Sequence, residues 1–229
     1  MLILRLTDLA DNPRYLLVLV LAIAIALIIG ISFHEFSHAF TAYLFGDHTA
    51  QERGRLTLNP AAHLDPFGTL MMLVIGFGWG KPTPVNPYKM RISPKTGMAL
   101  VSLAGPVSNL LLAALFALPL KFNLVHEAFT SNTSRWTMSN YLWELLFWVT
   151  LLNIILCVFN LIPLAPLDGS KLAAGLLPGE FGLFFLRLEP YGMQILMVLF
   201  MLSWISPNLN VIGRVTAPLE THLLQLLAA

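Results

Sequence analysis

The chain has 229 residues and is dominated by apolar side chains. Apolar residues make up 57% of the sequence and charged residues only 11%, with a mean hydropathy of +0.74. A soluble domain usually carries about 25% charged residues, so the composition predicts an integral membrane protein. A net charge of +1 provides no basic field, which excludes nucleic acid as a partner. The single cysteine, Cys157, cannot form an internal disulfide.

Four hydrophobic stretches predict an all-α polytopic membrane protein, formed by one domain over residues 1–229. The first helix follows Asp11-Asn12-Pro13, a cap with proline in the first turn. It exceeds the about 20 residues that span a bilayer, so it tilts or protrudes. The fourth is short for a span unless neighbouring residues extend it. The predicted helices cover about residues 14–46, 98–120, 141–162 and 189–206, and a weakly amphipathic tail, 209–229, is expected on the membrane interface.

Two apolar regions are broken by glycine and proline and do not fit a helix. Leu70–Trp79 is too short to span a membrane, and Lys81-Pro82-Thr83-Pro84 follows it closely. We therefore expect residues 68–87 to form a re-entrant segment between the first two helices, as an extended or β-hairpin. Such backbone at membrane depth must be covered by protein or line a wet cavity. The stretch Ala165–Leu188 is broken in the same way.

Basic residues predict the orientation in the membrane. If Gly46–Gly97 and Ala165–Leu188 share one side, that side holds eight Lys and Arg residues and the other holds five. The eight are Arg53, Arg55, Lys81, Lys89, Arg91, Lys95, Lys171 and Arg187. Because cytoplasmic loops carry an excess of basic residues, we expect the Gly46–Gly97 connection in the cytoplasm and both termini outside.

The first predicted helix contains His34-Glu35-Phe36-Ser37-His38, which matches the pattern His-Glu-x-x-His. Residues i and i+4 share one face of a helix, so both imidazoles can bind one zinc ion. Glu35 is close enough to take a proton from a water that the zinc activates. Polar groups in an apolar helix are costly and mark function. The motif lies about 18 Å along the helix before Gly46, inside the bilayer and toward the predicted cytoplasmic end.

A third zinc ligand is needed, because catalytic zinc usually has three protein ligands and one water. The candidates are His48, His63, Asp65 and Asp168. The two histidines lie in polar loop sequence, where a solvated side chain is common, and Asp65 fits a turn or a loop brace. Asp168 follows a proline-broken helix end, and a carboxylate at membrane depth favours a cation as its partner. The alternative for Asp168 is a cap on the following helix.

Five segments, in order along the chain, resemble the site-2 protease family of intramembrane zinc metalloproteases in its compact prokaryotic form. They are His34-Glu35-x-x-His38, Asn59-Pro60-x-x-His63-Leu64-Asp65-Pro66-x-Gly68, Gly78-Trp79-Gly80-Lys81-Pro82-x-Pro84-Val85-Asn86-Pro87, Ala104-Gly105-Pro106-x-x-Asn109 and Asn160-x-x-Pro163-x-x-Pro166-x-Asp168-Gly169. Many members of the family carry a PDZ or a CBS domain, and we expect neither here.

The resemblance implies one zinc ion per chain, with His34, His38 and Asp168 as ligands and Glu35 as general base. It also implies that Asn109 and Asn160 lie near the catalytic centre, where their amides could hold the substrate backbone or polarise its carbonyl. For Asn109 the alternative is helix–helix hydrogen bonding, helped by close approach at Gly105. The re-entrant segment would pair with extended substrate by strand addition, or would be a structural plug.

The function that the resemblance implies is that of a zinc metalloendopeptidase in the cell membrane, with its site toward the cytoplasm. Its expected substrates are single-span membrane proteins, cut within or next to their spans. One alternative is a membrane-anchored zinc peptidase that acts outside the bilayer. Another is a metal-binding scaffold or transporter, against which Glu35 and the lack of an internal repeat argue. The sequence does not determine the substrate, the regulatory trigger or the oligomeric state, and it is compatible with a homo-oligomer.

Overall fold

The described part of the chain is helical and has four segments long and apolar enough to cross a membrane. The computed structural model describes residues 13–68, 71, 78, 80–127 and 136–228. The four segments, long and apolar enough to span, are α2 (Pro13–Leu44), α6 (Pro94–Lys121), α7 (Met138–Asn160) and the run Gly179–Ile205. The predicted all-α membrane fold with four transmembrane helices is therefore confirmed.

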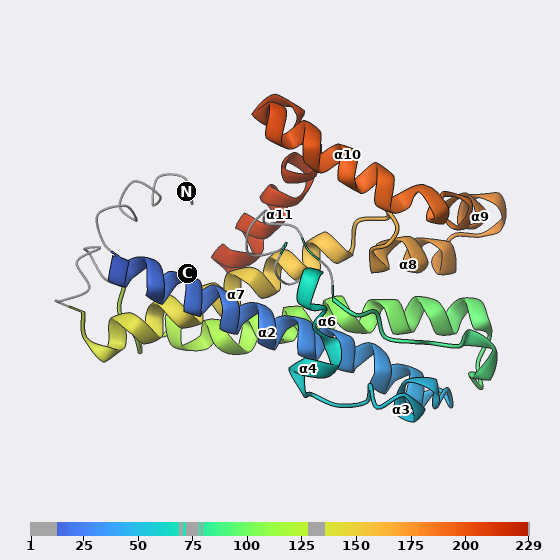
Figure 1. Ribbon diagram of the computed structural model, residues 1–229, viewed down its shortest axis with the longest axis horizontal. Coiled ribbons are helices and arrows are strands. Elements are labelled where there is room, and N and C mark those ends of the chain that lie inside the picture. The colour runs from blue at the N-terminus through green and yellow to red at the C-terminus, as the bar shows by residue number, and fades with distance from the viewer. Residues whose placement is uncertain (1–12, 69–70, 72–77, 79, 128–135, 229) are drawn as a thin grey trace.

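The body of the molecule is formed by α2, α6 and α7, which pack against one another (Figure 1). Gly30 lies where α2 and α7 approach closely, and an added Cβ there would lie 2.8 Å from Leu156 Cδ1 and 3.1 Å from Asn153 Oδ1. Small residues at helix contacts are common in membranes, where packing and hydrogen bonds rather than hydrophobic burial drive association. A buried cluster near the start of α2 consists of Tyr15, Leu19, Ala22, Ala26, Trp148 and Val149. This packing fixes the face of α2 that carries the zinc motif.

Ser93 and Pro94 set the beginning of α6. The Ser93 hydroxyl accepts a hydrogen bond from the Thr96 N–H at 3.2 Å, and Pro94 occupies the first turn, where its missing N–H has no cost. For this reason α6 begins before residue 98, the start expected from the apolar pattern alone.

Among its described residues, the connection between α2 and α6 contains several short elements. They are α3 (Thr49–Glu52), α4 (Pro60–His63) and the 3-10 turn η1 (Pro87–Lys89). An isolated antiparallel bridge joins Leu64 to Gly80. Nearly half of the predicted re-entrant segment 68–87 lies outside the described residues, namely residues 69–70, 72–77 and 79, so the hairpin and its pairing with substrate stay predictions.

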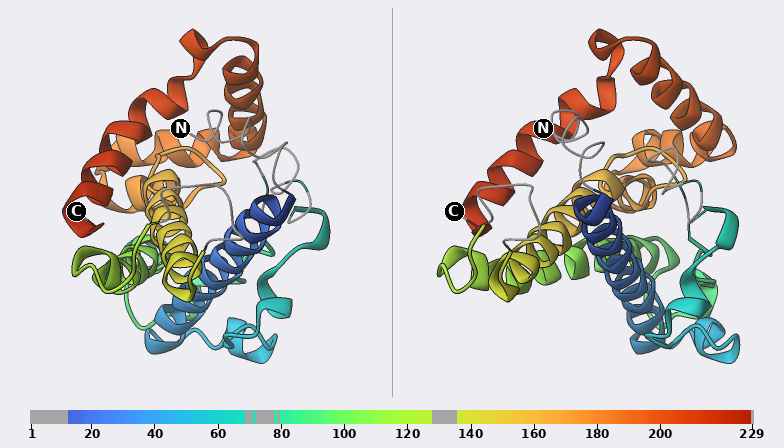
Figure 2. Two further views of the ribbon diagram at one scale, coloured as in Figure 1. Left: turned by 90° about the vertical axis from the view of Figure 1, so that its left-hand side faces the viewer. Right: turned by 60° about the vertical axis from the view of Figure 1, so that its left-hand side comes forward.

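The chain after α7 forms a second unit of helices beside the body. Its elements are α8 (Asp168–Leu176), α9 (Gly179–Leu188), η3 (Glu189–Tyr191), α10 (Gly192–Ile205), η4 (Pro207–Leu209) and α11 (Val211–Ala228). The predicted fourth helix, 189–206, is extended by α9 to a run of 27 residues, Gly179–Ile205. The expectation that Ala165–Leu188 does not fit a helix was wrong, because α8 and α9 form there between and after its prolines. Figure 2 shows α10 and α11 as the two legs of an inverted V, whose tip lies away from the bundle.

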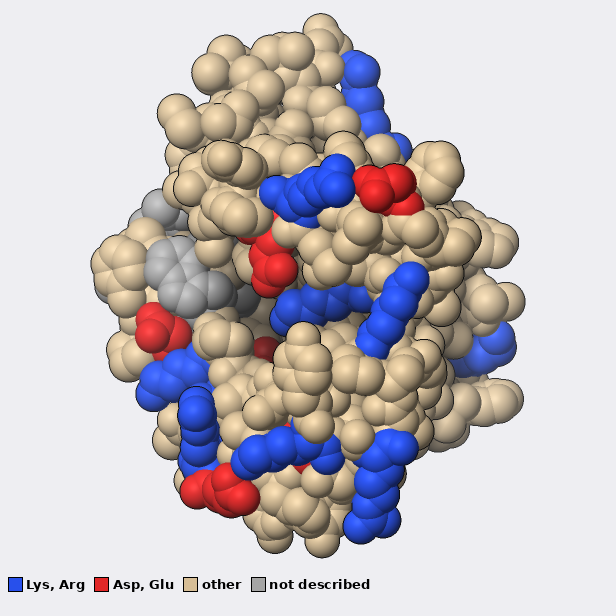
Figure 3. Space-filling view, turned by 90° about the vertical axis from the view of Figure 1, so that its right-hand side faces the viewer, with Lys and Arg blue, Asp and Glu red and all other residues tan. Residues whose placement is uncertain are grey.

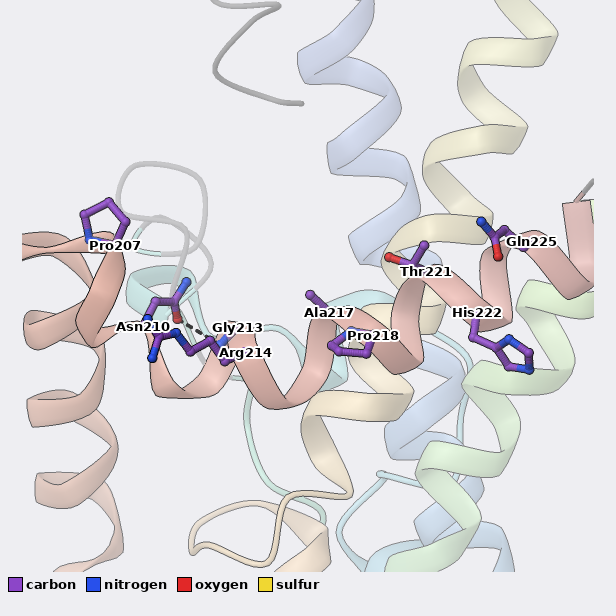
Figure 4. A pocket seen from close by; sticks show the side chains of 9 residues that line it. All are labelled: Pro207, Asn210, Gly213, Arg214, Ala217, Pro218, Thr221, His222 and Gln225. Atoms are coloured by element: carbon purple, nitrogen blue, oxygen red, sulfur yellow. Dashed lines mark hydrogen bonds between the residues drawn. The ribbon is translucent and has the colours of Figure 1, made fainter.

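The last helix, α11, returns to the body along one face. Its Leu223, Leu224 and Leu227 pack against a buried cluster of Ala113, Ile154 and Val158 from α6 and α7. Another part of α11 carries a shallow groove (Figure 4), lined by Pro207, Asn210, Gly213, Arg214, Ala217, Pro218, Thr221, His222 and Gln225. No residue predicted to be catalytic lines this groove. The interfacial location of the tail stays a prediction.

Candidate active site

Two histidines of α2 and one aspartate of α8 bring their ligand atoms together inside the molecule. Nε2 of His34 and Nε2 of His38 are 3.0 Å apart, and Oδ2 of Asp168 lies 3.0 Å from the first and 3.1 Å from the second. All three residues are buried or nearly so. Within the part of the chain that the structure describes, they form a group of side chains that could hold a metal ion.

This donor set fits zinc. Ligand atoms about 2.0–2.2 Å from a tetrahedral zinc lie roughly 3.3–3.5 Å from one another, close to the observed 3.0–3.1 Å. Two imidazole nitrogens and one carboxylate oxygen form a donor set typical of catalytic zinc. Gly105 of α6 keeps space beside them, because an added Cβ would lie 2.5 Å from His38 Nε2 and 2.6 Å from His34 Cε1. The lack of space for a side chain therefore explains why glycine occupies this position of the Ala-Gly-Pro segment.

Both histidine rings are oriented by hydrogen bonds at Nδ1. His34 Nδ1 lies 2.6 Å from Asn109 Oδ1, and His38 Nδ1 lies 2.6 Å from the Val101 carbonyl oxygen. Carbonyl oxygens only accept, so each Nδ1 carries the proton and donates it. The Nε2 lone pairs of both rings are then free to bind a metal ion, and a hydrogen bond of this kind usually supports a metal-bound histidine.

Asn109 links the three helices of the body. Its Nδ2 donates to the Gly30 carbonyl of α2 at 3.0 Å and to Asn153 Oδ1 of α7 at 2.9 Å. Asn109 is fully buried and lines neither of the cavities described below. Asn153, also fully buried, is not among the residues predicted from the sequence. The sequence does indicate Asn153, because an amide side chain in an apolar helix needs a hydrogen-bond partner.

Asp168 reaches the histidines because the chain turns sharply after α7. An added Cβ at Gly169 would run into the carbonyl oxygens of Leu161 and Ile162, so this turn requires glycine. Asp168 is the first residue of α8, whose N-cap is Leu167, and the structure shows no side-chain cap there.

The carboxylate of Glu35 is held by Thr83. The Thr83 N–H donates to Glu35 Oε2 at 2.9 Å, and the Thr83 hydroxyl donates to the same oxygen at 2.6 Å. Thr83 is not among the predicted site residues. Its position between Pro82 and Pro84, in a segment that resembles the family, is the signal that the sequence contains.

Two adjoining cavities lie beside these residues. A polar cavity of about 190 Å³ is lined by His34, Glu35, His38, Thr83, Asn160, Asp168 and Lys171, among others. A second cavity, of about 330 Å³, shares His34, Glu35 and Asn160 and is otherwise lined mainly by apolar side chains of α2, α7 and α10. Asn160 therefore lies where both cavities meet, while its Nδ2 donates to the Leu156 carbonyl at 2.9 Å.

The other three ligand candidates have local partners and line neither cavity. His48 Nδ1 is 3.1 Å from Gln51 Oε1, the buried His63 donates from Nε2 to the Thr57 carbonyl at 2.6 Å, and Asp65 accepts from the Gly68 N–H at 2.8 Å. These contacts organise the connection between α2 and α6.

One end of the molecule is rich in basic side chains. Figure 3 shows Lys and Arg side chains gathered on this face around a hollow. Figure 1 places α3, from the first connection, and α8 with α9 toward the same end of the bundle. The two basic regions of the sequence therefore share one side of the molecule, which the predicted orientation in the membrane requires.

Comparison with known proteins identifies the family. Residues 123–203 match the model of peptidase family M50. The chain is 42% identical to "Putative zinc metalloprotease YwhC" of Bacillus subtilis over 180 residues, which cover 78% of this chain and 79% of that protein. It is 33% identical to proteins named "Putative zinc metalloprotease Rip2" from Mycobacterium tuberculosis and Mycolicibacterium smegmatis, over 80% and 70% of this chain and 66% and 60% of theirs. No solved structure matches it. The chain belongs to peptidase family M50, the site-2 protease family, and is a multi-pass membrane zinc protease.

Proposed function

We propose that the protein cleaves single-span membrane proteins within or next to their transmembrane segments. The observation that carries this proposal is the convergence of His34, His38 and Asp168, with ligand atoms 3.0–3.1 Å apart, among helices apolar enough to span a membrane. A buried polar cluster at membrane depth is costly and is retained where it has a function.

In the proposed mechanism, His34, His38 and Asp168 would hold one zinc ion, which would act as a Lewis acid toward the water and the peptide carbonyl. Glu35 takes the proton of the attacking water as the new carbon–oxygen bond forms. When the carbon–nitrogen bond breaks, Glu35 passes this proton to the leaving amine.

The two cavities support a membrane substrate. A transmembrane helix must unwind locally before its backbone can be cut, and the freed backbone groups then need polar partners. The apolar cavity could hold substrate side chains, while Asn160, at its junction with the polar cavity, could pair with the unwound backbone. For Asn109, which is buried and bonded to His34, we propose support of that zinc ligand.

The substrate and the role of Glu35 can be tested together. Single-span proteins that accumulate in cells with Glu35→Gln, compared with wild type, are purified and reconstituted with the enzyme in proteoliposomes, and the products are located by mass spectrometry. We expect cleavage within or next to the span, at least about 100-fold slower for Glu35→Gln, with unchanged zinc content. Glu52→Gln, an exposed residue paired with Lys89, is the matched control and should cleave normally.

Three outcomes would contradict the proposal. Cleavage confined to soluble segments would favour a membrane-anchored peptidase that acts outside the bilayer. Zinc binding without any hydrolysis would favour a metal-binding membrane protein. Normal activity of Glu35→Gln would remove Glu35 as the base.

We also propose that the basic end of the molecule faces the cytoplasm. In a variant without Cys157, a cysteine at the exposed Arg53 should react with an impermeant maleimide only after the cells are permeabilised. A cysteine at the exposed Leu124, after the other end of α6, should react in intact cells. The reverse pattern would invert the topology.

A further inference from the structure

We infer that Thr83 is a positioning residue for the general base, held in place by a brace formed by residues 81–86. The inference rests on the proposed function of Glu35. Thr83 would act by fixing the Glu35 carboxylate, without contacting the substrate.

The contacts of Thr83 define the orientation of the carboxylate. Its N–H and its hydroxyl both donate to Oε2 of Glu35, at 2.9 and 2.6 Å, and the hydroxyl also lies 3.1 Å from the Glu35 carbonyl oxygen. Two donors on one oxygen fix the plane of the carboxylate. The other oxygen, Oε1, accepts no hydrogen bond from the described residues and is left to take the proton of the water.

Both ends of the brace are tied to the protein. The Lys81 N–H donates to the His63 carbonyl at 2.7 Å, and the Arg55 guanidinium donates to the Lys81 carbonyl. At the other end the Asn86 N–H donates to Asp47 Oδ2 at 2.6 Å. Thr83 thus lies between two anchors that are close to it in sequence.

Two prolines stiffen the segment between the anchors. Pro82 and Pro84 have a fixed φ, and a residue that precedes proline is restricted to extended conformations. Thr83 is therefore confined by its own neighbours before it contacts Glu35. A base held in advance of the reaction needs no ordering in the transition state, and a displacement of about 1 Å can cost roughly 100-fold in rate.

The brace also explains the buried His63. Its Nε2 donates to the Thr57 carbonyl and its own carbonyl accepts from Lys81, so it supports the anchor of the brace. The sequence places this histidine among the ligand candidates in a polar loop, and its contacts in the structure support that loop instead.

The test compares Thr83→Val with Thr83→Ser in the proteoliposome assay, on a single-span protein that wild type cleaves, with Glu35→Gln measured alongside. Valine keeps the shape and the backbone N–H but removes the hydroxyl, whereas serine keeps the hydroxyl. For Thr83→Val we expect kcat to fall about 10- to 100-fold, with KM within about twofold and zinc content unchanged. Thr83→Ser should stay within about threefold of wild type, and Thr221→Val, exposed on α11, should match wild type.

The outcomes separate this inference from the proposed function. If Glu35→Gln is inactive but Thr83→Val has a normal or higher kcat, the inference fails and the function of Glu35 stands. Equal losses for valine and serine, or a change in KM alone, would also overturn it, because they indicate a packing or substrate-binding role. If Glu35→Gln remains active, the proposed function itself fails.

Discussion

The two halves of the candidate site are held in different ways. The ligand half, with its two histidines His34 and His38, is fixed inside the helix bundle. Both histidines donate to acceptors on α6, and Asn153 of α7 accepts a hydrogen bond from one of these acceptors, Asn109. The base half is fixed from outside the bundle, because Glu35 is held by the loop that carries Thr83. The geometry of the ligands thus depends on the packing of membrane helices, whereas the alignment of the base depends on an anchored loop.

This difference predicts that the two halves can be perturbed separately. A buried polar network has no water to replace a lost partner, so a change there should displace a ligand and alter zinc binding. A change in the loop should alter the rate of cleavage while the metal site stays intact. Zinc content and kcat are therefore the measurements that distinguish the halves.

The largest effect on the ligand half is expected from Asp168→Asn. This change replaces a charged ligand by a neutral amide, and even partners outside the first ligand shell affect metal affinity about 10- to 100-fold. We expect zinc affinity to fall by more than about 100-fold, together with activity. The measurement is metal content by mass spectrometry after dialysis against a graded chelator, with Asp65→Asn as the control. Full zinc retention would exclude Asp168 as a ligand.

A smaller effect is expected from Asn109→Leu. Leucine cannot accept from His34 Nδ1, and it leaves Gly30 and Asn153 without their donor. We expect zinc affinity to fall about 10- to 100-fold and the free energy of unfolding by about 1–3 kcal/mol. The exposed Asn208→Leu is the control. A lower kcat with normal zinc affinity would instead support the substrate-binding role that the sequence suggested for Asn109.

The sequence predicts His34 and His38 from a local rule, because they are one helical turn apart. Asp168 is 130 residues from His38 and was one of four candidates, so its prediction depended on the resemblance to the family as well as on the prolines and the glycine around it. Their supporting partners could not be predicted in this way. Thr83 is 48 residues from Glu35, and Asn109 is 44 residues from Asn153. Such contacts depend on which helix faces meet and on the path of a loop, and no repeating pattern of residues in the sequence indicates either.

The fold shows the same limit at the fourth transmembrane segment. Its apolar residues predict a helix over residues 189–206, and the glycines and prolines of Ala165–Leu188 argued against a helix before it, whereas the structure has α9 there, joined to α10 through Pro190. The structure continues through this proline because Glu189–Tyr191 form a 3-10 turn in which Pro190 lies at the beginning, where it needs no N–H partner. The helix therefore gains α9, which an apolar pattern interrupted by proline does not indicate.

The smallest effect is expected from Asp47→Asn, which loosens the brace of the base half. The Asp47 carboxylate is fully buried and accepts from Thr49 through Oδ1 and from the Asn86 N–H through Oδ2. An amide would turn its NH₂ group toward one of these donors, at a cost of about 1–3 kcal/mol in unfolding free energy near pH 7. Because the brace is anchored at Asp47, kcat should fall by less than in Thr83→Val, with normal zinc content.

The stabilisation that the Asp47 carboxylate gives depends on pH, and the direction of its pKa shift decides where it is lost. Burial raises the pKa of Asp47, but hydrogen bonds from Thr49 and Asn86 and the charge of Lys89 hold it below its usual value. A lowered pKa in the folded state means that the ionised carboxylate stabilises the fold fully above the unfolded pKa of about 4. This stabilisation is lost as pH falls through the folded pKa. The difference in Tm between wild type and Asp47→Asn should therefore be constant above about pH 5 and shrink in more acidic solution. A loss of zinc in this variant would instead show that the two halves of the site are coupled.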